Sequence, residues 1–223
     1  MNKKSTLQST LLDPRVLIGF ILSCVMTIPA HAGTITVTNT NDSGPGSLRQ
    51  SLADANDGDT INFDVSLKGQ TIALTSDELV IDKSITITGP GSDQLAVSAD
   101  MQYFRIFHVM AGPAVTIEGL TIGPSYAYYG CGILNDQATL TINNCAVGGN
   151  VGLESAAGIF NVGGTLTVVN SSITGNSLLY QGDGPGVLSS GTLTIDHSII
   201  SDNFAGKGYT HGGGIWHLQL RDA

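Results

Sequence analysis

The chain has 223 residues, a formal net charge of −9, only 12% charged residues and 29 glycines. Such an acidic balance excludes nucleic acid and anionic lipid as partners, because proteins bind both through basic patches. Sparse charge combined with many glycines is typical of short strands joined by tight turns, and it argues against a disordered chain or a helical bundle.

Residues 1–32 are predicted to be a signal peptide. Lys3 and Lys4 begin a basic segment, an apolar run follows over residues 16–26, and an Ala-x-Ala cleavage site ends at Ala32. The run is too short for a transmembrane helix, which needs about 20 apolar residues. A lipoprotein signal built on Cys24 is the alternative, although the residues before it fit a lipobox poorly. We therefore expect an exported protein, secreted or associated with the cell surface or outer membrane, with no transmembrane helix in the mature chain.

Residues 33–64 are predicted to cap the N-terminal end of a solenoid. Apolar residues alternate with polar ones over 34–37 and 60–63, which predicts a strand in each place. Between them, Ser47 is placed to cap a short helix over residues 48–56, with Leu48, Leu52 and Ala55 on one face. A solenoid exposes its core at an uncovered end, so an amphipathic helix there has a structural use. The acidic residues 54–59 do not match EF-hand spacing, and we assign them to the end of the helix rather than to calcium.

The rest of the chain, residues 65–223, is organised by two repeated motifs. TLTINNCAVGGN at 139–150 returns as TLTVVNSSITGN at 165–176 and as TLTIDHSIISDN at 192–203. GILN, GIFN, GVLS and GIWH begin at residues 132, 158, 186 and 214. Repeats of this length indicate a stacked architecture. With short strands and no leucine-rich signature, they predict an all-β fold: a single-stranded right-handed parallel β-helix with about 25–27 residues per coil.

Asparagine recurs at fixed places in both motifs, at Asn150, Asn176 and Asn203 in the first and at Asn135 and Asn161 in the second. Stacked asparagines can hydrogen-bond to one another along the axis, so we predict two asparagine ladders. Asparagine also tolerates left-handed backbone geometry at a corner. The alternative is that each is an isolated turn residue.

Three histidines near the C-terminus could form a metal site if the coils brought them together with Asp196. They are His197, His211 and His217. However, His197 aligns with asparagines of the earlier copies, and so does His217. Their spacing gives no closed ligand set, so we interpret them as substituted repeat positions and predict no metal site and no cofactor.

Two cysteines remain after the signal peptide, Cys131 and Cys145. An exported protein could join them in a disulfide, provided that their Cα atoms lie within about 7 Å. The alternative, which we favour, is that both are small buried apolar residues with inert thiols.

The opening SGPGSLRQSLADANDGDTINFD at 43–64, together with the GxGI-N and TLTI-S-I-N motifs, resembles bacterial right-handed parallel β-helix repeat proteins of the pectin-lyase-like group, with a CSLREA-type N-terminal region. The resemblance covers nearly the whole chain after the leader. It implies a large exported or surface-anchored protein, either adhesin-like or active on polysaccharides. The last coil stops without a polar cap, so we expect a truncated member whose open coil could associate end to end.

A catalytic site is not evident from the sequence. Enzymes of this group use clustered aspartates with an arginine, and glycoside hydrolysis needs two carboxylates at a set separation. No aspartates stack at equivalent repeat positions, and Arg105 is expected to project outward from a strand between Phe104 and Ile106. We predict an exported, non-catalytic scaffold, adhesin-like or in contact with carbohydrate. A polysaccharide lyase or glycoside hydrolase of the same fold is the alternative.

The best candidates for ligand contact are Tyr126, Tyr128 and Tyr129, which are predicted to lie in a loop between coils. A tyrosine offers an apolar ring and a polar hydroxyl, which suits stacking on a sugar. Functional contacts commonly sit on loops over a rigid scaffold. A polysaccharide or a cell-surface ligand is the partner that these residues predict; the alternative is a corner that covers a hydrophobic edge.

Overall fold

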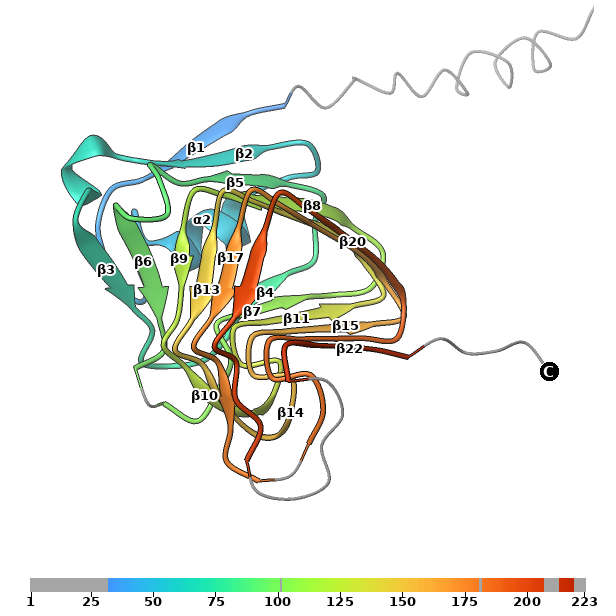
Figure 1. Cartoon of the computed structure of the whole chain (residues 1–223). Helices are drawn as coiled ribbons and strands as arrows, with labels where there is room; N and C mark the ends of the chain where they lie inside the picture. Colours follow the sequence, from blue (N-terminus) through green and yellow to red (C-terminus); the bar gives the residue numbers. More distant parts are fainter. Residues whose placement is uncertain (1–31, 101, 181, 207–212, 219–223) are drawn as a thin grey trace, which may run out of the picture. The chain divides into compact units, whose positions relative to one another are not determined.

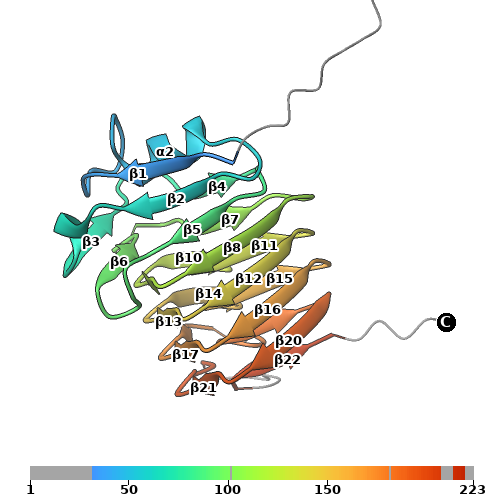
Figure 2. The same ribbon diagram turned by 90° about the horizontal axis from the view of Figure 1, so that it is seen from above.

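The computed structural model describes residues 32–100, 102–180, 182–206 and 213–218. Over this part the chain winds into coils of parallel strands that stack in sequence order (Figures 1 and 2). The predicted parallel β-helix is confirmed. All but the last residue of the expected signal peptide lies outside the described residues, as does His211. No helix in the described part of the chain is long and apolar enough to cross a membrane.

Each complete coil contributes one strand to each of three parallel sheets. The first sheet contains β1 (Thr34–Val37), β2 (Thr60–Phe63), β5 (Thr86–Thr88), β8 (Ala114–Glu118), β12 (Thr139–Asn143), β16 (Thr165–Val169) and β20 (Thr192–Asp196). The second contains β3 (Gln70–Ala73), β6 (Leu95–Ser98), β9 (Thr121–Ile122), β13 (Ala146–Gly148), β17 (Ser172–Thr174) and β21 (Ile199–Ser201). The third contains β4 (Leu79–Ile81), β7 (Phe107–Val109), β11 (Ile133–Asp136), β15 (Ile159–Val162), β19 (Val187–Ser189) and β22 (Ile215–His217).

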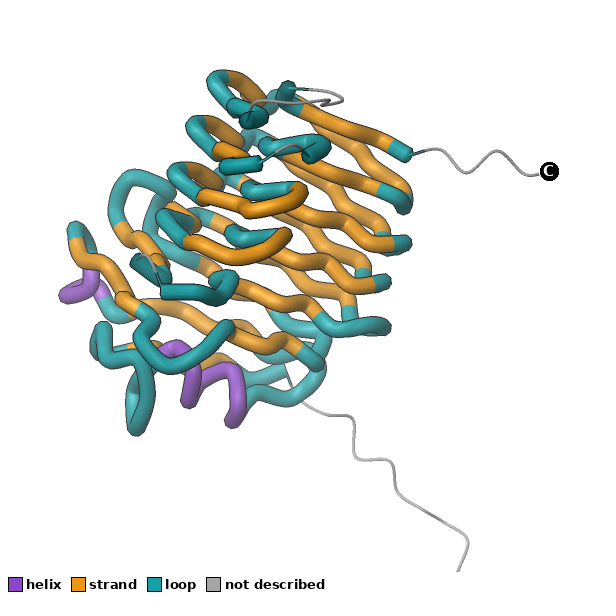
Figure 3. The backbone as a smooth tube through the Cα atoms, turned by 90° about the horizontal axis from the view of Figure 1, so that it is seen from below, coloured by secondary structure: helices purple, strands orange, loops and turns teal. Residues whose placement is uncertain are grey.

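A short fourth sheet lies between the second and third sheets along the chain. It contains β10 (Tyr126–Tyr129), β14 (Val151–Ser155) and β18 (Ser177–Leu178). Outside the strands, the described chain forms helix α2 (Leu48–Asp54) and one 3₁₀ turn at Val65–Leu67. Figure 3 shows the repeated strands joined by short connections from coil to coil.

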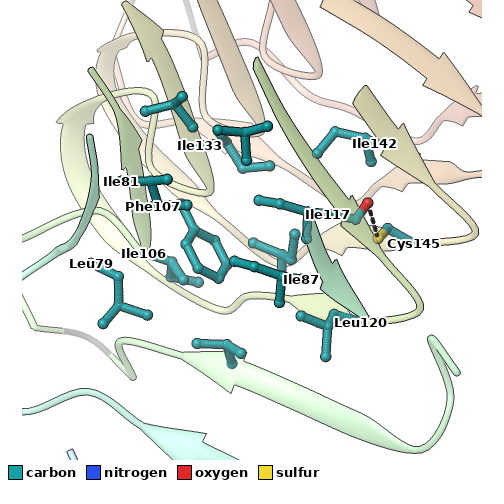
Figure 4. Packing of buried hydrophobic residues seen from close by; sticks show 14 of the residues in the cluster. Leu79, Ile81, Ile87, Ile106, Phe107, Ile117, Leu120, Ile133, Ile142 and Cys145 are labelled. Carbon is teal, nitrogen blue, oxygen red and sulfur yellow. Dashed lines mark hydrogen bonds between the residues drawn. The ribbon is translucent and has the colours of Figure 1, made fainter. Parts of the chain in front are cut away.

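Aliphatic columns along the axis fill the inside of the coils. In β12, Leu140 and Ile142 are fully buried, while the threonines between and beside them face outward. Leu166 and Val168 of β16 stack on them in register and are equally buried. Figure 4 shows this packing around Phe107, which is also fully buried. The alternation that predicted these strands therefore assigns the core correctly.

The last described coil is less covered. The side chains that continue the aliphatic columns there, Leu193 and Ile195 of β20, are only partly buried. Ile199 of β21 is 64% exposed. The end-to-end association predicted for this coil stays a prediction.

Helix α2 closes the N-terminal end of the core. The Ser47 side chain accepts a hydrogen bond from the Gln50 amide at 3.1 Å, as an N-cap does. Leu48, Leu52 and Ala55 are buried in the same cluster as the first core strands, so the predicted face is confirmed. The helix ends at Asp54, two residues earlier than expected, because Ala55 already has extended backbone with ψ at 149°.

Arg49 fastens this helix to the first coils. Its Nη1 donates to the carbonyl of Glu78 at 2.7 Å, and its Nη2 donates to the carbonyl of Asp77 at 2.6 Å. The same Nη2 lies 2.7 Å from Asp42 Oδ1. The pKa of Asp42 is lowered to about 2: burial, which alone would raise it, is outweighed by hydrogen bonds from Ser76 and Arg49 and by the Arg49 charge.

Two asparagine ladders run along the coils, as predicted. In the first, Asn150 Nδ2 donates to Asn176 Oδ1, and Asn176 Nδ2 donates to Asn203 Oδ1, both at 2.9 Å. In the second, Asn135 Nδ2 donates to Asn161 Oδ1 at 2.7 Å, and Asn161 Nδ2 donates to a serine hydroxyl of the next coil at 2.9 Å. All but Asn203 are fully buried. Each ladder ties one coil to the next where the core reaches a corner.

The residues with left-handed backbone are not the ladder asparagines themselves. Positive φ occurs at Asn144, Asn170 and His197, with values of 49°, 49° and 44°. These three residues directly follow β12, β16 and β20. In the first ladder, it is the residue before each asparagine that is left-handed, such as Gly149 with a φ of 71°. The left-handed role proposed for the ladder asparagines is therefore wrong, and the role belongs to their neighbours.

The glycine of the second motif lies tightly between the backbone of the next coil and the ladder of the first motif. A Cβ on Gly158 would collide with the carbonyl oxygen of Gly186 in the next coil and would lie 3.1 Å from Asn176 Nδ2. A Cβ on Gly132 would likewise lie 2.6 Å from the carbonyl oxygen of Gly158 and 3.1 Å from Asn150 Nδ2. The two repeated motifs, far apart along one coil, are thus coupled by a single close contact.

We predict that Asn176→Ala destabilises the fold by about 3 kcal/mol, because it removes a donor and an acceptor and leaves buried polar groups of two coils unpaired. Asn143→Ala is the matched control: its side chain is on the outer surface and accepts one exposed hydrogen bond at 3.3 Å. Urea denaturation of both variants measures the difference. Equal losses would show that the ladder adds nothing beyond a surface contact.

We predict an acid-dependent stability that is traceable to Asp42. Its folded pKa of about 2 lies below that of an unfolded aspartate, about 3.9. The stability that its charged form provides is therefore complete above about pH 4 and is lost as the pH falls towards 2. Thermal melting from pH 5 to pH 2 should show a smaller pH-dependent loss for Asp42→Asn than for the unaltered chain. Parallel curves would contradict the assignment.

Candidate functional site

The tyrosines singled out in the sequence lie on a strand rather than in a loop. They belong to β10, which pairs in parallel with β14 through Tyr126 and Val151. Their register shifts after Ala127, which marks an irregularity in the strand. Tyr128 is 52% exposed and Tyr129 is 40% exposed, whereas Tyr126 is half-buried.

A fourth tyrosine, Tyr103, joins them from the preceding coil. Its ring centroid lies 5.3 Å from that of Tyr126 and 5.3 Å from that of Tyr128, tilted to the first and edge-on to the second. Tyr129 packs edge-on against Phe160 of β15 at 5.9 Å. We call Tyr103, Tyr126, Tyr128 and Tyr129 the tyrosine cluster. Edge-on and tilted ring pairs are the favourable arrangements, so the cluster holds its exposed rings in fixed orientations.

A set of three polar side chains, Glu78, Arg105 and His108, lies next to the tyrosine cluster. Arg105 Nε lies 2.7 Å from Glu78 Oε2, and His108 Nδ1 lies 2.8 Å from Glu78 Oε1. The Arg105 guanidinium carbon also stands 5.2 Å from the centre of the Tyr129 ring, a cation–π contact. The side chains of Arg105, Glu78 and His108 are only 18%, 21% and 17% exposed. The expectation that Arg105 projects outward from a strand is wrong, since it precedes β7 and its side chain is mostly buried.

A small cavity lies between these two groups. It has a volume of about 150 Å³ and is lined by Glu78, Tyr103, Phe104, Arg105, Ala127, Tyr128 and Tyr129. Its lining therefore combines aromatic rings with one carboxylate and one guanidinium. Because that pair is internally neutralised, the cavity suits a small polar, uncharged group beside the rings.

The hydroxyl of Tyr103 stays protonated. Partial loss of solvation, followed by a hydrogen bond with Tyr128 and by repulsion from Tyr128, Tyr126 and Glu154, raises the pKa of Tyr103 well above its usual value. A protonated phenol both donates and accepts hydrogen bonds. Tyr103 therefore offers the cluster a hydroxyl group that can both donate and accept.

A larger depression of about 520 Å³ lies beside helix α2. Its lining includes Arg49, Asp77, Glu78, Asp82 and Lys83. Arg49 already donates hydrogen bonds to the carbonyl oxygens of Glu78 and Asp77, and Lys83 pairs with Asp82 at 3.1 Å. This depression is a consequence of how the helix is fastened, and we do not assign a ligand to it.

The C-terminal histidines do not assemble a metal site in the described residues. His197 Nδ1 lies 2.7 Å from Asp196 Oδ1, and both side chains are exposed. His217 pairs in register with Ser189, in the row of Asn161, as the repeat alignment predicted. No group of three or more metal-ligating side chains occurs among the described residues.

Both cysteines are free and buried. The Cys145 thiol lies 3.5 Å from the carbonyl oxygen of Ile117, as Figure 4 shows, and the Cys131 thiol lies 3.2 Å from that of Val151. Burial raises the pKa of Cys131 to about 12 and that of Cys145 to about 11. The interpretation as buried, unpaired cysteines is confirmed, and the raised pKa of each thiol disfavours the reactive thiolate.

Comparison with known proteins adds no assignment. No family model, no curated protein and no solved structure matches the chain.

The sequence pointed to three members of this site and missed the rest. Glu78 and Arg105 precede β4 and β7, which lie side by side in the third sheet through the pairing of Leu79 with Phe107. That register brings together residues about 27 positions apart. The signal that could have found them is the coil length itself, because counting one coil back from Arg105 arrives at Glu78.

We predict that Glu78→Ala destabilises the fold by about 2 kcal/mol, since it leaves Arg105 without its counter-ion in a mostly buried place. The matched control is Asp82→Ala, which removes an ion pair whose Asp82 side chain is 65% exposed, and which should cost less than about 0.5 kcal/mol. Denaturant titration of the two variants tests this. A loss for Glu78→Ala no larger than that for Asp82→Ala would contradict a structural role for the pair.

Proposed function

We propose that this protein is an exported, non-catalytic β-helix scaffold that binds carbohydrate at a cell surface through the tyrosine cluster. The observation that carries the proposal is the exposure of Tyr103, Tyr128 and Tyr129 around one cavity, with fixed ring orientations and a charged pair beneath them. Export is proposed from the leader pattern of residues 1–32.

The chemistry of the cluster suits a sugar. Tyrosine rings stack on the apolar face of a pyranose, and their hydroxyls bond to its hydroxyl groups. The carboxylate of Glu78 and the guanidinium of Arg105 add an acceptor and a donor at the cavity. The net charge of −9 disfavours an acidic polymer, so the proposed ligand is neutral.

The same geometry supports binding rather than bond cleavage. Among the described residues, the cavity lining contains a single carboxylate, Glu78, whose two oxygens already face Arg105 and His108. Glycoside hydrolysis generally needs two carboxylates, one on each side of the scissile bond. We accordingly propose that this chain shares its fold and its export with the pectin-lyase-like group. Lyase or hydrolase activity is the disfavoured alternative.

The scaffold itself is well suited to such a role. Tyr126, Tyr128 and Tyr129 lie on β10, which is held to the neighbouring β14 by backbone hydrogen bonds, such as that from the Val151 amide to the Ser125 carbonyl at 2.8 Å. Ligand contacts held on rigid elements lose little conformational entropy on binding. Binding should therefore leave the fold unchanged.

We predict that the double variant Tyr128→Ala, Tyr129→Ala lowers affinity for a neutral polysaccharide at least about tenfold, because each exposed ring lost removes on the order of 1 kcal/mol of stacking. Affinity electrophoresis through gels that contain soluble neutral or acidic polysaccharides measures the effect. Tyr180→Ala is the control, since Tyr180 is 63% exposed but lies outside the cavity lining. The proposal fails if the unaltered protein is retarded by no neutral polysaccharide, or if the control loses as much affinity as the double variant.

A further inference from the structure

A row of threonines crosses the outer face of the first sheet, with one threonine on each of its seven strands. Figure 2 shows these strands lying side by side, and their pairing keeps the threonines in register without a shift. The two threonines at the ends of the row are exposed, and the five between them are partly exposed because each is flanked by the next. The members of the row are Thr34, Thr60, Thr86, Thr116, Thr141, Thr167 and Thr194.

A second, shorter row lies two residues earlier on the later strands of the same sheet. Thr139, Thr165 and Thr192 are in register there, and Ala114 of β8 continues the row on one side. We call the two rows together the threonine array. No member of the array is charged, although the chain carries 18 acidic residues.

The fold does not require threonine at these positions. Two residues later on the same strands, the side chain changes from each coil to the next. That column contains Thr36, Asn62, Thr88, Glu118, Asn143, Val169 and Asp196. Threonine suits an exposed strand, but valine, isoleucine and tyrosine suit it as well. One side chain kept in all seven coils, beside a column that varies in every coil, therefore indicates a demand made by the surface itself.

The hydroxyl groups of the threonine array face solvent. In the described part of the chain, the threonine hydroxyls that donate hydrogen bonds to protein atoms are those of Thr75 and Thr121, and neither belongs to the array. A β-branched side chain has few choices at χ1. Equivalent backbone positions in register therefore present their methyl and hydroxyl groups in the same direction, and the array forms a regular grid of both groups.

The spacing of this grid is set by the strands. Neighbouring threonines of one row are about 4.8 Å apart from strand to strand, and the two rows are about 6.6 Å apart along each strand. Both distances are close to repeats of the oxygen lattice on the prism face of hexagonal ice. Seven strands make the longer row about 29 Å long, so the match extends over several repeats of the crystal.

We propose that the threonine array is an ice-binding surface, whose ligand is the crystalline face of frozen water. A hydroxyl bonds equally well to liquid water, so hydrogen bonding alone gives no preference for ice. The preference comes from order: the fixed methyl and hydroxyl groups hold a water layer in lattice positions before the crystal arrives, which lowers the entropic cost of binding. A depression of about 140 Å³ beside Ala114, lined also by Thr116 and Thr139, has room for several waters of this layer.

The chemistry of the threonine array favours ice over a protein partner. Ice is uncharged, and the array is an uncharged area on an acidic chain, so the two are complementary in charge. A protein interface is anchored by large residues such as tryptophan, tyrosine and arginine, and the array contains none of them. A peptide that adds a strand needs an open sheet edge, whereas the array lies on the face of the sheet.

The test is thermal hysteresis, the interval below the melting temperature in which a single ice crystal neither grows nor melts. The full chain should produce such an interval and should become concentrated in slowly grown ice. Thr167→Lys places a long charged side chain in the longer row and should abolish both effects, because it holds the crystal face away from the grid. Thr174→Lys is the matched control: it makes the same change at a partly exposed threonine of β17 in the second sheet and should alter neither effect.

Thermal melting followed by circular dichroism checks that each variant is folded. Thr116→Lys, two strands before Thr167 in the longer row, repeats the test should Thr167→Lys fail to fold. An unaltered chain without hysteresis, or a control that loses as much as the array variants, would overturn the ice-binding surface.

This inference is separate from the proposed carbohydrate site, because the tyrosines of β10 belong to the fourth sheet. The double variant Tyr128→Ala, Tyr129→Ala should keep its full hysteresis, and Thr167→Lys should keep its retardation by neutral polysaccharide. Failure of one proposal is therefore distinguished from failure of the other.

Discussion

The register between coils is the constraint on which this structure depends. A parallel β-helix is stable only if the backbone groups, core side chains and corners of each coil lie in register with those of the coil before it. The asparagine ladder enforces this at a corner, because Asn176 donates its side-chain amide upward and accepts from both the backbone and the side chain of Asn150. A slip of one residue would bury the threonines and expose the leucines.

The same constraint explains why the two repeated motifs occur together. A Cβ on Gly158 would collide with the carbonyl oxygen of Gly186 in the next coil and would also press against the buried ladder amide of Asn176. A glycine so placed allows the third sheet to approach the ladder closely. The glycine of one motif therefore packs against the asparagine of the other, and a substitution in either motif would disturb both.

Because the core positions of every coil must match, the coils differ from one another mainly in their outer side chains and in the connections between sheets. The fourth sheet occurs in the coils of β10, β14 and β18, and the exposed tyrosines stand on the first of these strands. Glu78, Arg105 and His108 take outer or connecting positions of adjacent coils, where the register brings them within hydrogen-bonding distance. A site of this kind is assembled across coils, and no single repeat contains it.

The sequence by itself determined the fold class, the aliphatic columns, both asparagine ladders and the capping helix, because each follows from local alternation or from recurrence at a fixed interval. It misplaced what depends on backbone geometry: the end of α2 at Asp54, the left-handed corner before Asn150, and the strand that carries Tyr128. Only the tertiary structure decided the site, because Tyr103, Arg105 and Glu78 become neighbours through stacking.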